Sequence, residues 1–494
     1  MLQLRCSAQN YDWGRQADNS EVAKLARANG SSIDESKPFA ELWMGAHPNC
    51  PSKVKSTGES LQACLDKHPQ LLGSTVQKHF GNQLPFLFKV LSVAKALSIQ
   101  SHPDKQLAQR LHREHPKLYA DPNHKPEMAL ALSDFEALCG FASTAELQER
   151  LRRVPELAAL VGAERVAAIM ALGTAPAAGE EEEKQAKQAL KAAFTALMTS
   201  DQAAVTAAVR SLVTRLSAAA ASSSGEGLTE HEALALRLNQ QFPDDVGLMS
   251  AFFLNLVRLP PGSAIYLAAN EPHAYLSGEL VELMAASDNV IRAGLTPKFK
   301  HADVLCESLT YRQGLPEVLI GSPAVPGITV YQPPFEEFEI HRLECDSSET
   351  GSDYGSANSS PSAVAASAAA SDAFQDQPRM TLPASEGPRI LLVQSGQVEA
   401  EVLGHLPAEL ETVPELERGA VLGRGSIVLI PAGVELALRR AEGLVGWIAA
   451  VNATCFRLQD ARQTAAPAVA AGKAARRAAE EEVPAAPALA VAAL

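Results

Sequence analysis

The chain has 494 residues, of which 46% are hydrophobic and 20% are charged, values that are ordinary for a globular protein with a large core. At about 150 residues per domain, this length predicts about three structural units. The formal net charge of −14 argues against nucleic-acid binding, for which a basic face is expected. The same charge disfavours an anionic ligand unless the fold builds a local basic pocket.

The distribution of cysteines and apolar residues indicates the cellular environment. The seven cysteines are scattered without any CxxC pair, so the sequence predicts no disulfide framework and favours a reducing compartment. The N-terminal residues lack the apolar core of a secretory signal. No stretch reaches 18 consecutive apolar residues. We therefore expect a cytoplasmic protein that binds neither a membrane nor nucleic acid.

The composition changes along the chain. Residues 1–142 mix aromatic and turn residues, whereas residues 143–256 are rich in helix formers with apolar residues spaced near 3.6. Ser143 lies three residues before Glu146, a typical helix start. The acidic run at 179–184 is predicted to be a solvated connection between helices.

The next part of the chain is predicted to be β-rich. The Pro-Pro-Gly run at 260–262 should end the helical block, and strands are expected to resume after it. Short apolar runs recur between residues 320 and 455, which predicts an antiparallel sandwich or barrel. The Ser/Ala-rich stretch at 346–377 has too little apolar bulk to offset its ordering entropy, so a disordered insert is expected there. The Ala-rich tail at 459–494 is expected to be disordered as well.

The residues best suited to chemistry concentrate between positions 89 and 127. Ser98, Gln100 and His102 alternate, so on a strand they would share one face, which Pro103 would end. An amide oxygen and an imidazole on one face can bind a cation. A polar strand face at the mouth of a barrel explains the same pattern equally well.

Two further candidates lie elsewhere in the chain. Glu127 follows Pro126, which fixes an extended path, and its carboxylate could be a zinc ligand or a surface charge. His273 lies in an alternating stretch and could point inward, although an isolated strand histidine is more often structural. Spacing alone does not bring these distant residues together, so the patterns leave a metal site open.

Longer segments are more specific. Residues 119–127 (YADPNHKPE) and 273–298 (HAYLSGELVELMAASDNVIRAGLTPK) resemble the two signature segments of the type I mannose-6-phosphate isomerases. Three other blocks, at 10–14, 41–52 and 84–105, resemble that family and occur in the family's order. The resemblance covers roughly 1–142 and 250–315, and it is weak through the helical block and the C-terminal strands.

The resemblance implies a mainly β fold with an α-helical insert, built from two cupin-type β jelly rolls and a helical domain. The catalytic cupin domain would comprise residues 1–142 and 257–320, and the helical domain residues 143–256. A C-terminal cupin-like domain would cover residues 321–458. That domain has Val434, Glu435 and Leu436 where a metal-binding cupin places a histidine, so the metal is expected in the first barrel alone.

The resemblance also implies a function. The family interconverts D-mannose 6-phosphate and D-fructose 6-phosphate by proton transfer through an enediol(ate), with one Zn²⁺ per chain. The family's zinc ligands map onto four residues of this chain, Gln100, His102, Glu127 and His273. Its catalytic arginine maps onto Arg292, and Lys125 and Glu282 are candidate proton carriers. Its remaining substrate-binding residues map onto Trp13, Lys89, Ser98 and Lys298.

Two alternatives to the isomerase remain open from the sequence. The chain could be a non-catalytic cupin that binds sugar phosphates, or a metal-dependent cupin oxygenase. A monomer that acts on a small phosphosugar is the expectation that follows from the resemblance.

Overall fold

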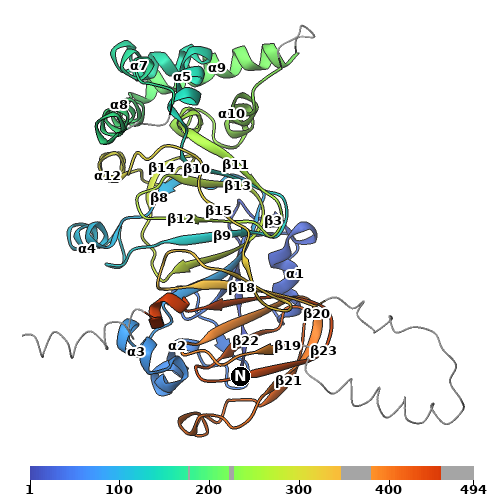
Figure 1. The fold of residues 1–494 in the computed structure, drawn as a ribbon. Helices are drawn as coiled ribbons and strands as arrows, with labels where there is room; N and C mark the ends of the chain where they lie inside the picture. Colours follow the sequence, from blue (N-terminus) through green and yellow to red (C-terminus); the bar gives the residue numbers. More distant parts are fainter. Residues whose placement is uncertain (176–178, 222–226, 346–379, 458–494) are drawn as a thin grey trace, which may run out of the picture.

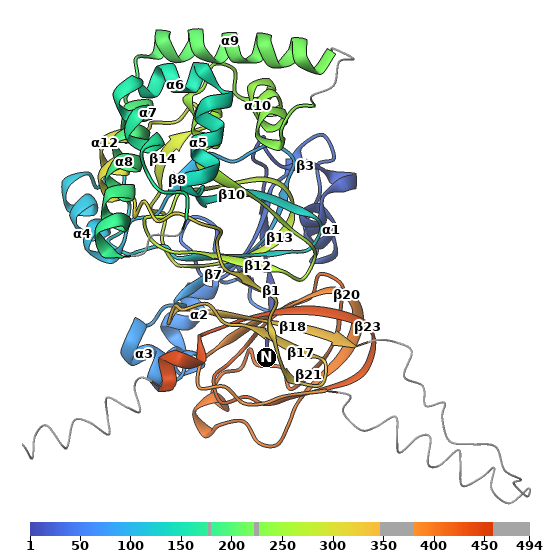
Figure 2. The ribbon, with the colours of Figure 1, turned by 45° about the horizontal axis from the view of Figure 1, so that its top comes forward.

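The computed structural model describes residues 1–175, 179–221, 227–345 and 380–457. Figures 1 and 2 show three stacked parts, with helices at the top, an 11-stranded sheet in the middle and a 10-stranded sheet at the bottom. The predicted fold class, mainly β with a helical insert, is therefore confirmed. The segments predicted to be disordered, 346–377 and 459–494, lie outside the described residues.

The 11-stranded sheet is organised around one long strand. Its main path runs through β15 (Val318–Leu319), β12 (Ala264–Leu267), β9 (Glu127–Ala131), β13 (His273–Ala285), β7 (Phe86–Val93), β5 (Glu41–Met44) and β2 (Ser7–Gln9). Four strands branch from this path: β8 (Ile99–Ser101), β10 (Phe135–Phe141), β11 (Leu254–Leu259) and β14 (Ile291–Gly294). One half of β13 pairs with β7 and β9, and the other half pairs with β8 and β10. Strand β13 therefore brings distant segments to one interior.

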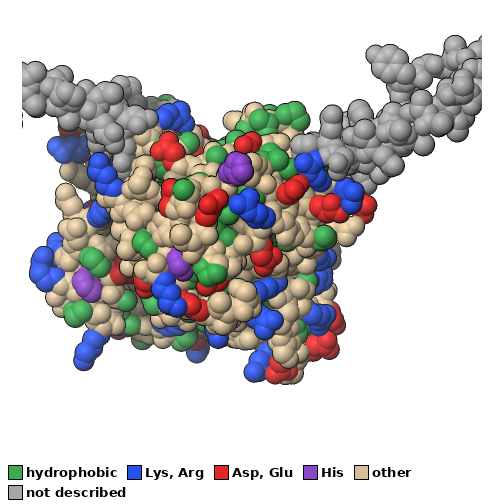
Figure 3. Space-filling model, turned by 90° about the horizontal axis from the view of Figure 1, so that it is seen from below, with side chains coloured by type: hydrophobic (Ala, Val, Ile, Leu, Met, Phe, Trp, Pro, Cys, Tyr) green, Lys and Arg blue, Asp and Glu red, His purple; other side chains and the backbone are tan. Residues whose placement is uncertain are grey.

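The 10-stranded sheet combines both ends of the described chain. Its strands are β16 (Ser322–Val325), β17 (Ile328–Tyr331), β18 (Glu339–Cys345), β23 (Leu436–Ala450), β20 (Arg389–Val402), β22 (Ile427–Ile430), β1 (Leu2–Arg5), β6 (Lys53–Val54), β19 (Met380–Leu382) and β21 (Gly419–Gly423). Strand β1 pairs with β22, with Leu2 opposite Leu429. One sheet therefore uses two distant stretches of the chain. The domain boundaries expected from the sequence stay predictions. Seen from below, basic and acidic side chains are intermixed on the visible surface (Figure 3).

The helical region begins where the sequence predicts it. The Ser143 side chain accepts a bond from the Glu146 backbone, and Glu146 bonds back to Ser143, which forms a complete capping box. The region contains α5 (Thr144–Arg153), α6 (Pro155–Val161), α7 (Ala163–Met170), α8 (Glu180–Met198), α9 (Gln202–Ala221), α10 (Glu230–Gln241) and α11 (Val246–Ser250). The other helices are α1 (Glu21–Ala28), α2 (Leu61–Lys67), α3 (Ser74–Phe80), α4 (Lys105–Glu114) and α12 (Ala302–Ser308). Within the described residues, no helix has the length and apolar character needed to cross a membrane.

Two expectations about this region are wrong. The acidic run predicted as a connection instead forms the first turn of α8, because carboxylates near a helix N-terminus interact favourably with the helix dipole. The helical block also ends before Pro260 and Pro261. Strand β11 precedes these prolines and pairs with β10, with Leu259 opposite Phe135.

The helical region and the strands nearest to it share one hydrophobic core. Phe194 and Phe253 of the helical region belong to the same buried cluster as Ile99 of β8 and Ile291 of β14. Burial of apolar surface therefore fixes β8 and β14 against the helices. These two strands carry several of the predicted site residues.

Glu279 on β13 is buried beneath α1. The Ser92 hydroxyl donates to its carboxylate, and Arg15 Nη1 lies 3.3 Å from Glu279 Oε1. Burial raises the pKa of Glu279 to about 7, against 4.5 for an ordinary glutamate. The folded chain therefore retains a proton that the unfolded chain releases.

This raised pKa predicts a pH-dependent stability. The stabilisation from the protonated carboxyl is fully present below pH 4.5 and is lost as the pH rises through about 7. Between about pH 5 and about pH 8, the wild-type protein should lose about 2 kcal/mol relative to a Glu279→Gln variant, which stays neutral. Thermal midpoints of both proteins at the two pH values test this. Midpoints that change in parallel would contradict it.

Candidate metal centre and active-site cavity

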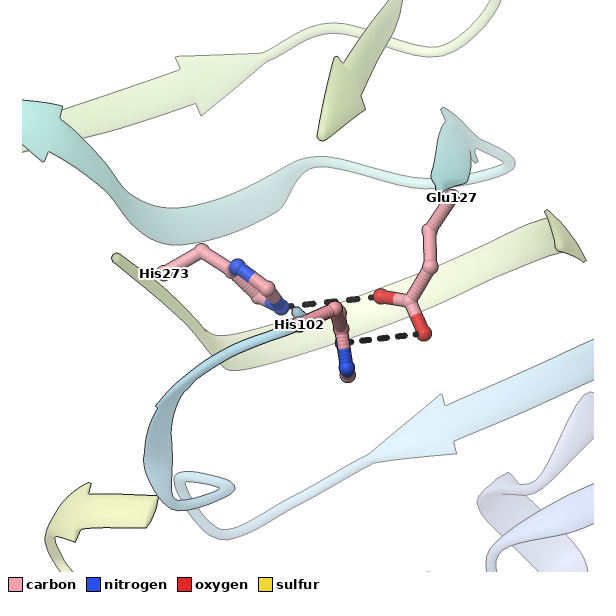
Figure 4. A group of neighbouring side chains, drawn as sticks. All are labelled: His102, Glu127 and His273. Carbon is pink, nitrogen blue, oxygen red and sulfur yellow. Dashed lines mark ion pairs between the residues drawn. The ribbon is translucent and has the colours of Figure 1, made fainter. Parts of the chain in front are cut away.

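Three of the predicted ligands converge inside the 11-stranded sheet. His102 follows the end of β8, while Glu127 and His273 are the first residues of β9 and β13. His273 lies opposite Gln100 in the β13–β8 pair, and Glu127 lies opposite Met284 at the other end of β13. The side chains of the two histidines and Glu127 point toward one another (Figure 4).

The geometry of these three side chains suits a metal ion. Their ligand atoms all lie within 4.8 Å of one another. Glu127 Oε1 is 3.3 Å from His102 Nε2, and Glu127 Oε2 is 3.5 Å from His273 Nε2. All three residues are buried, with at most 2% of their surface exposed. In the described part of the chain, this is the one such group of His, Cys, Asp or Glu residues.

Hydrogen bonds fix the orientation of both imidazole rings. His102 Nδ1 lies 2.7 Å from the Asn289 carbonyl oxygen, and His273 Nδ1 lies 3.0 Å from the Glu271 carbonyl oxygen. A carbonyl can only accept, so each Nδ1 carries the proton and each Nε2 presents a lone pair. Both Nε2 atoms are buried without a hydrogen-bond partner. A bound cation would satisfy both of these nitrogen atoms and the carboxylate beside them.

The ionisation states of His102 and Glu127 also favour a bound metal ion. Burial lowers the pKa of His102 to about 4, so its imidazole is neutral at pH 7. Burial alone would raise the pKa of Glu127, but the charges around it, that of Lys125 among them, hold that pKa well below the usual value. Two imidazole nitrogens and one carboxylate form the N/O donor set of a zinc site. The residues present therefore fit a divalent metal ion.

Gln100 lies beside this group. The Ser98 hydroxyl donates to Gln100 Oε1 over 3.1 Å, and Gln100 is opposite both His273 and Arg292 in the sheet. The strand here is shorter than the alternating pattern predicts, because β8 covers only Ile99–Ser101. Ser98 and Gln100 nevertheless face the same cavity.

A cavity of about 870 Å³ opens beside the metal-binding group. Nine of the predicted site residues line it: Trp13, Lys89, Ser98, Gln100, Lys125, Glu127, Glu282, Arg292 and Lys298. The two histidines are not part of this lining, but each has its Nε2 within 3.5 Å of Glu127, which is. The structure thus brings the whole predicted set to one place.

Charged side chains on neighbouring strands form a buried network in the cavity wall. Lys89 lies opposite Glu282 in the β7–β13 pair and opposite Trp43 in the β5–β7 pair. Lys89 Nζ is 3.1 Å from Glu282, 3.3 Å from Glu41 and 4.8 Å from the Trp43 ring centre. Although burial alone would lower the pKa of Lys89, the two carboxylates raise it. Burial raises the pKa of Glu282.

The remaining cations differ in their pairing. Lys125 Nζ lies 3.3 Å from Glu127 Oε1, so this charge is neutralised. Among the residues that the structure describes, neither Arg292 nor Lys298 has a carboxylate within 4.0 Å. Burial lowers the pKa of Arg292, but a guanidinium stays protonated in proteins. These two cations therefore remain available to an anionic ligand.

Sequence reasoning assigned no role to three residues of this cavity, Glu41, Trp43 and Tyr275. Trp43 Nε1 donates to Glu41 Oε2 over 2.5 Å, which orients the carboxylate toward Lys89. The hydroxyl of Tyr275 is buried without a hydrogen-bond partner. Their alternation with residues that were assigned, such as His273 with Tyr275, could have placed them on the same face.

Comparisons with known proteins show what the chain is similar to. A family model described as phosphomannose isomerase type I, catalytic domain, matches residues 1–144. The model of the helical insertion domain of that family matches residues 160–254. Mannose-6-phosphate isomerase 1 of Arabidopsis thaliana is 40% identical over 457 residues, which cover 92% of this chain and 94% of that protein. The mannose-6-phosphate isomerase of Mus musculus is 42% identical over 357 residues, covering 70% and 82%.

Solved structures show the same fold. A crystal structure of phosphomannose isomerase from Salmonella typhimurium, with the E264A mutation, has a TM-score of 0.69 at 25% identity. That similarity covers 91% of this chain and 98% of the other. A crystal structure of mannose 6-phosphate isomerase bound with zinc and yttrium has a TM-score of 0.68, also at 25% identity, and covers 91% and 98%.

Proposed function

The chain belongs to the type I mannose-6-phosphate isomerases, which are aldose–ketose isomerases, and from this we propose that it works by zinc-dependent proton transfer. The substrate pair is D-mannose 6-phosphate and D-fructose 6-phosphate. The observation that carries the proposal is the buried His102–Glu127–His273 group beside a cavity with two unpaired cations.

One Zn²⁺ per chain would be held by His102, Glu127 and His273, with Gln100 as a further ligand. Bound there, the ion supplies Lewis-acid polarisation of a substrate oxygen. Glu127 would be the anionic member of this ligand set. The zinc-bound relative is consistent with this choice of metal.

Proton transfer between C2 and C1 needs a base that reaches both carbons. In the aldose-to-ketose direction, the base removes the C2 proton, which gives an enediol(ate), and then delivers a proton to C1. Glu282 suits this role, because burial raises its pKa above the usual value and it lines the cavity. Lys125 is the alternative, and both candidates are ion-paired, Lys125 with Glu127 over 3.3 Å and Glu282 with Lys89 over 3.1 Å.

The other cavity residues would bind and orient the sugar phosphate. Arg292 stabilises the negative charge that develops on the enediolate. Lys298, also unpaired, attracts the phosphate group, and Ser98 and Lys89 are further candidates for contacts with it. Trp13 offers an apolar surface to the sugar at the mouth of the cavity.

An assay in D₂O tests the proposal directly. Metal-loaded protein should convert mannose 6-phosphate to fructose 6-phosphate and incorporate deuterium at C1, because an enediol(ate) route passes through a protein-bound exchangeable proton. Treatment with a chelator should abolish turnover, and about one equivalent of Zn²⁺ per chain should restore it. Product without any deuterium would contradict the proton-transfer route. Full activity in the metal-free protein would contradict the zinc requirement.

The same assay separates the two alternatives. A non-catalytic sugar-phosphate-binding protein would bind the substrate without forming product, and an oxygenase would consume oxygen. The cytoplasmic location and the monomeric state stay predictions.

A further inference from the structure

The turn between helices α10 and α11 reaches the cavity from the helical region. Gln241, the last residue of α10, and three residues of the turn line the cavity: Phe242, Pro243 and Asp245. Residues of the loop that follows β14 lie in the same wall: Leu295, Thr296, Pro297 and Lys298. This loop directly follows the strand that carries Arg292.

Asp245 connects the turn to the loop through two contacts and also caps α11. Its Oδ1 accepts hydrogen bonds from the backbone N–H groups of Leu295 and Gly247, both over 2.7 Å. Its Oδ2 lies 3.4 Å from Lys300 Nζ. Leu295 has φ 54°, a conformation that residues other than glycine rarely adopt. The loop therefore begins at a residue with an unfavourable backbone conformation. The hydrogen bond from the Leu295 N–H to Asp245 helps to hold this conformation.

The two backbones approach as closely as glycine allows. A Cβ atom at Gly247 would lie 2.5 Å from the Leu295 nitrogen, and one at Gly294 would lie 2.5 Å from Gly247 Cα. A second link joins the helical region to another lining segment, because Gln241 Oε1 accepts from the Ala96 N–H over 2.9 Å, two residues before Ser98. The turn is thus fitted to the loops that carry substrate-binding candidates.

We propose that Asp245 is a positioning residue for the isomerase reaction. It fixes the Leu295 backbone and thereby the place of Lys298 and of the end of the strand that carries Arg292. The proposal rests on the function proposed above for those two cations. Because a displacement of about 1 Å at a reacting centre can lower a rate about 100-fold, Asp245 then influences turnover through the positions of Lys298 and Arg292.

Asp245→Ala should lower kcat/KM for mannose 6-phosphate by about 10- to 100-fold while the zinc content stays unchanged. Asp245→Asn keeps an oxygen acceptor for both N–H groups and should recover most of the activity. Asp201→Ala is the matched control, since Asp201 accepts from Ala203 and Ala204 at the exposed start of α9. This control removes a similar cap in the same helical region and should leave kcat/KM unchanged.

A second variant tests the close approach of the α11 backbone to the loop. Gly247→Ala forces the two backbones apart and should reproduce the kinetic loss of Asp245→Ala without loss of zinc. Asp245→Ala activity within about twofold of the Asp201→Ala control would overturn the proposal, and so would an Asn variant as impaired as the Ala variant. Arg292→Ala is measured in parallel. If that variant alone stays active, the role of Arg292 fails, whereas loss in Asp245→Ala still supports positioning through Lys298.

Discussion

His273→Ala should lose its bound zinc and nearly all turnover. The change removes one of two buried imidazoles and leaves Glu127 with a single histidine partner at 3.3 Å. Zinc acting as a Lewis acid is worth several kcal/mol, so turnover should fall about 10³-fold or more. Elemental analysis of the purified variant measures the metal, and the coupled isomerase assay measures the rate.

A matched control exists in the other sheet. His341 Nε2 on β18 lies 2.8 Å from Glu339 Oε1, so these residues also form a His–Glu pair, although His341 is only partly buried. His341→Ala should keep both zinc and activity, because that pair lies in the 10-stranded sheet. Unchanged zinc content in His273→Ala would refute the assignment of His273 as a ligand.

Arg292→Ala should keep its zinc but lose most of its turnover. Arg292 lies opposite Gln100 in the β14–β8 pair and faces the cavity without a carboxylate partner in the described chain. Loss of one preorganised group that stabilises developing negative charge costs about 10²- to 10³-fold in kcat. Steady-state kinetics together with zinc analysis test this expectation.

A conservative variant separates the effect of the positive charge from that of the donor geometry. Arg292→Lys keeps the positive charge but not the planar fork of donors, so it should recover only part of the lost turnover. Near-normal turnover in a fully zinc-loaded Arg292→Ala variant would contradict the role of this residue. A parallel loss of zinc would instead place Arg292 in metal binding.

The local charge of the cavity differs from the charge of the whole chain. The net charge of −14 disfavours an anionic substrate, and Lys89 and Lys125 do not reverse this, because Glu41, Glu282 and Glu127 neutralise them. What favours an anion is the unpaired state of Arg292 and Lys298. Counting basic residues in the motifs overestimates the positive charge of the cavity, since ion pairing depends on strand register.

Several features were determined by the sequence itself. Ser143 and Glu146 predicted the start of α5, since a capping box is local. The alternation of Ser98 and Gln100 predicted a shared face, because strand periodicity is local too. The motifs that resemble the isomerase family indicated each site residue by type and order.

Other features were decided only by the tertiary structure. The sequence left open whether His102, Glu127 and His273 meet, because they belong to segments that only the pairing of β13 with its neighbours brings together. The link from Asp245 to Leu295 also has no local pattern, since it joins two loops through backbone groups. Local periodicity determines which way a side chain points along its own element. Long-range pairing and shared burial determine what lies opposite it.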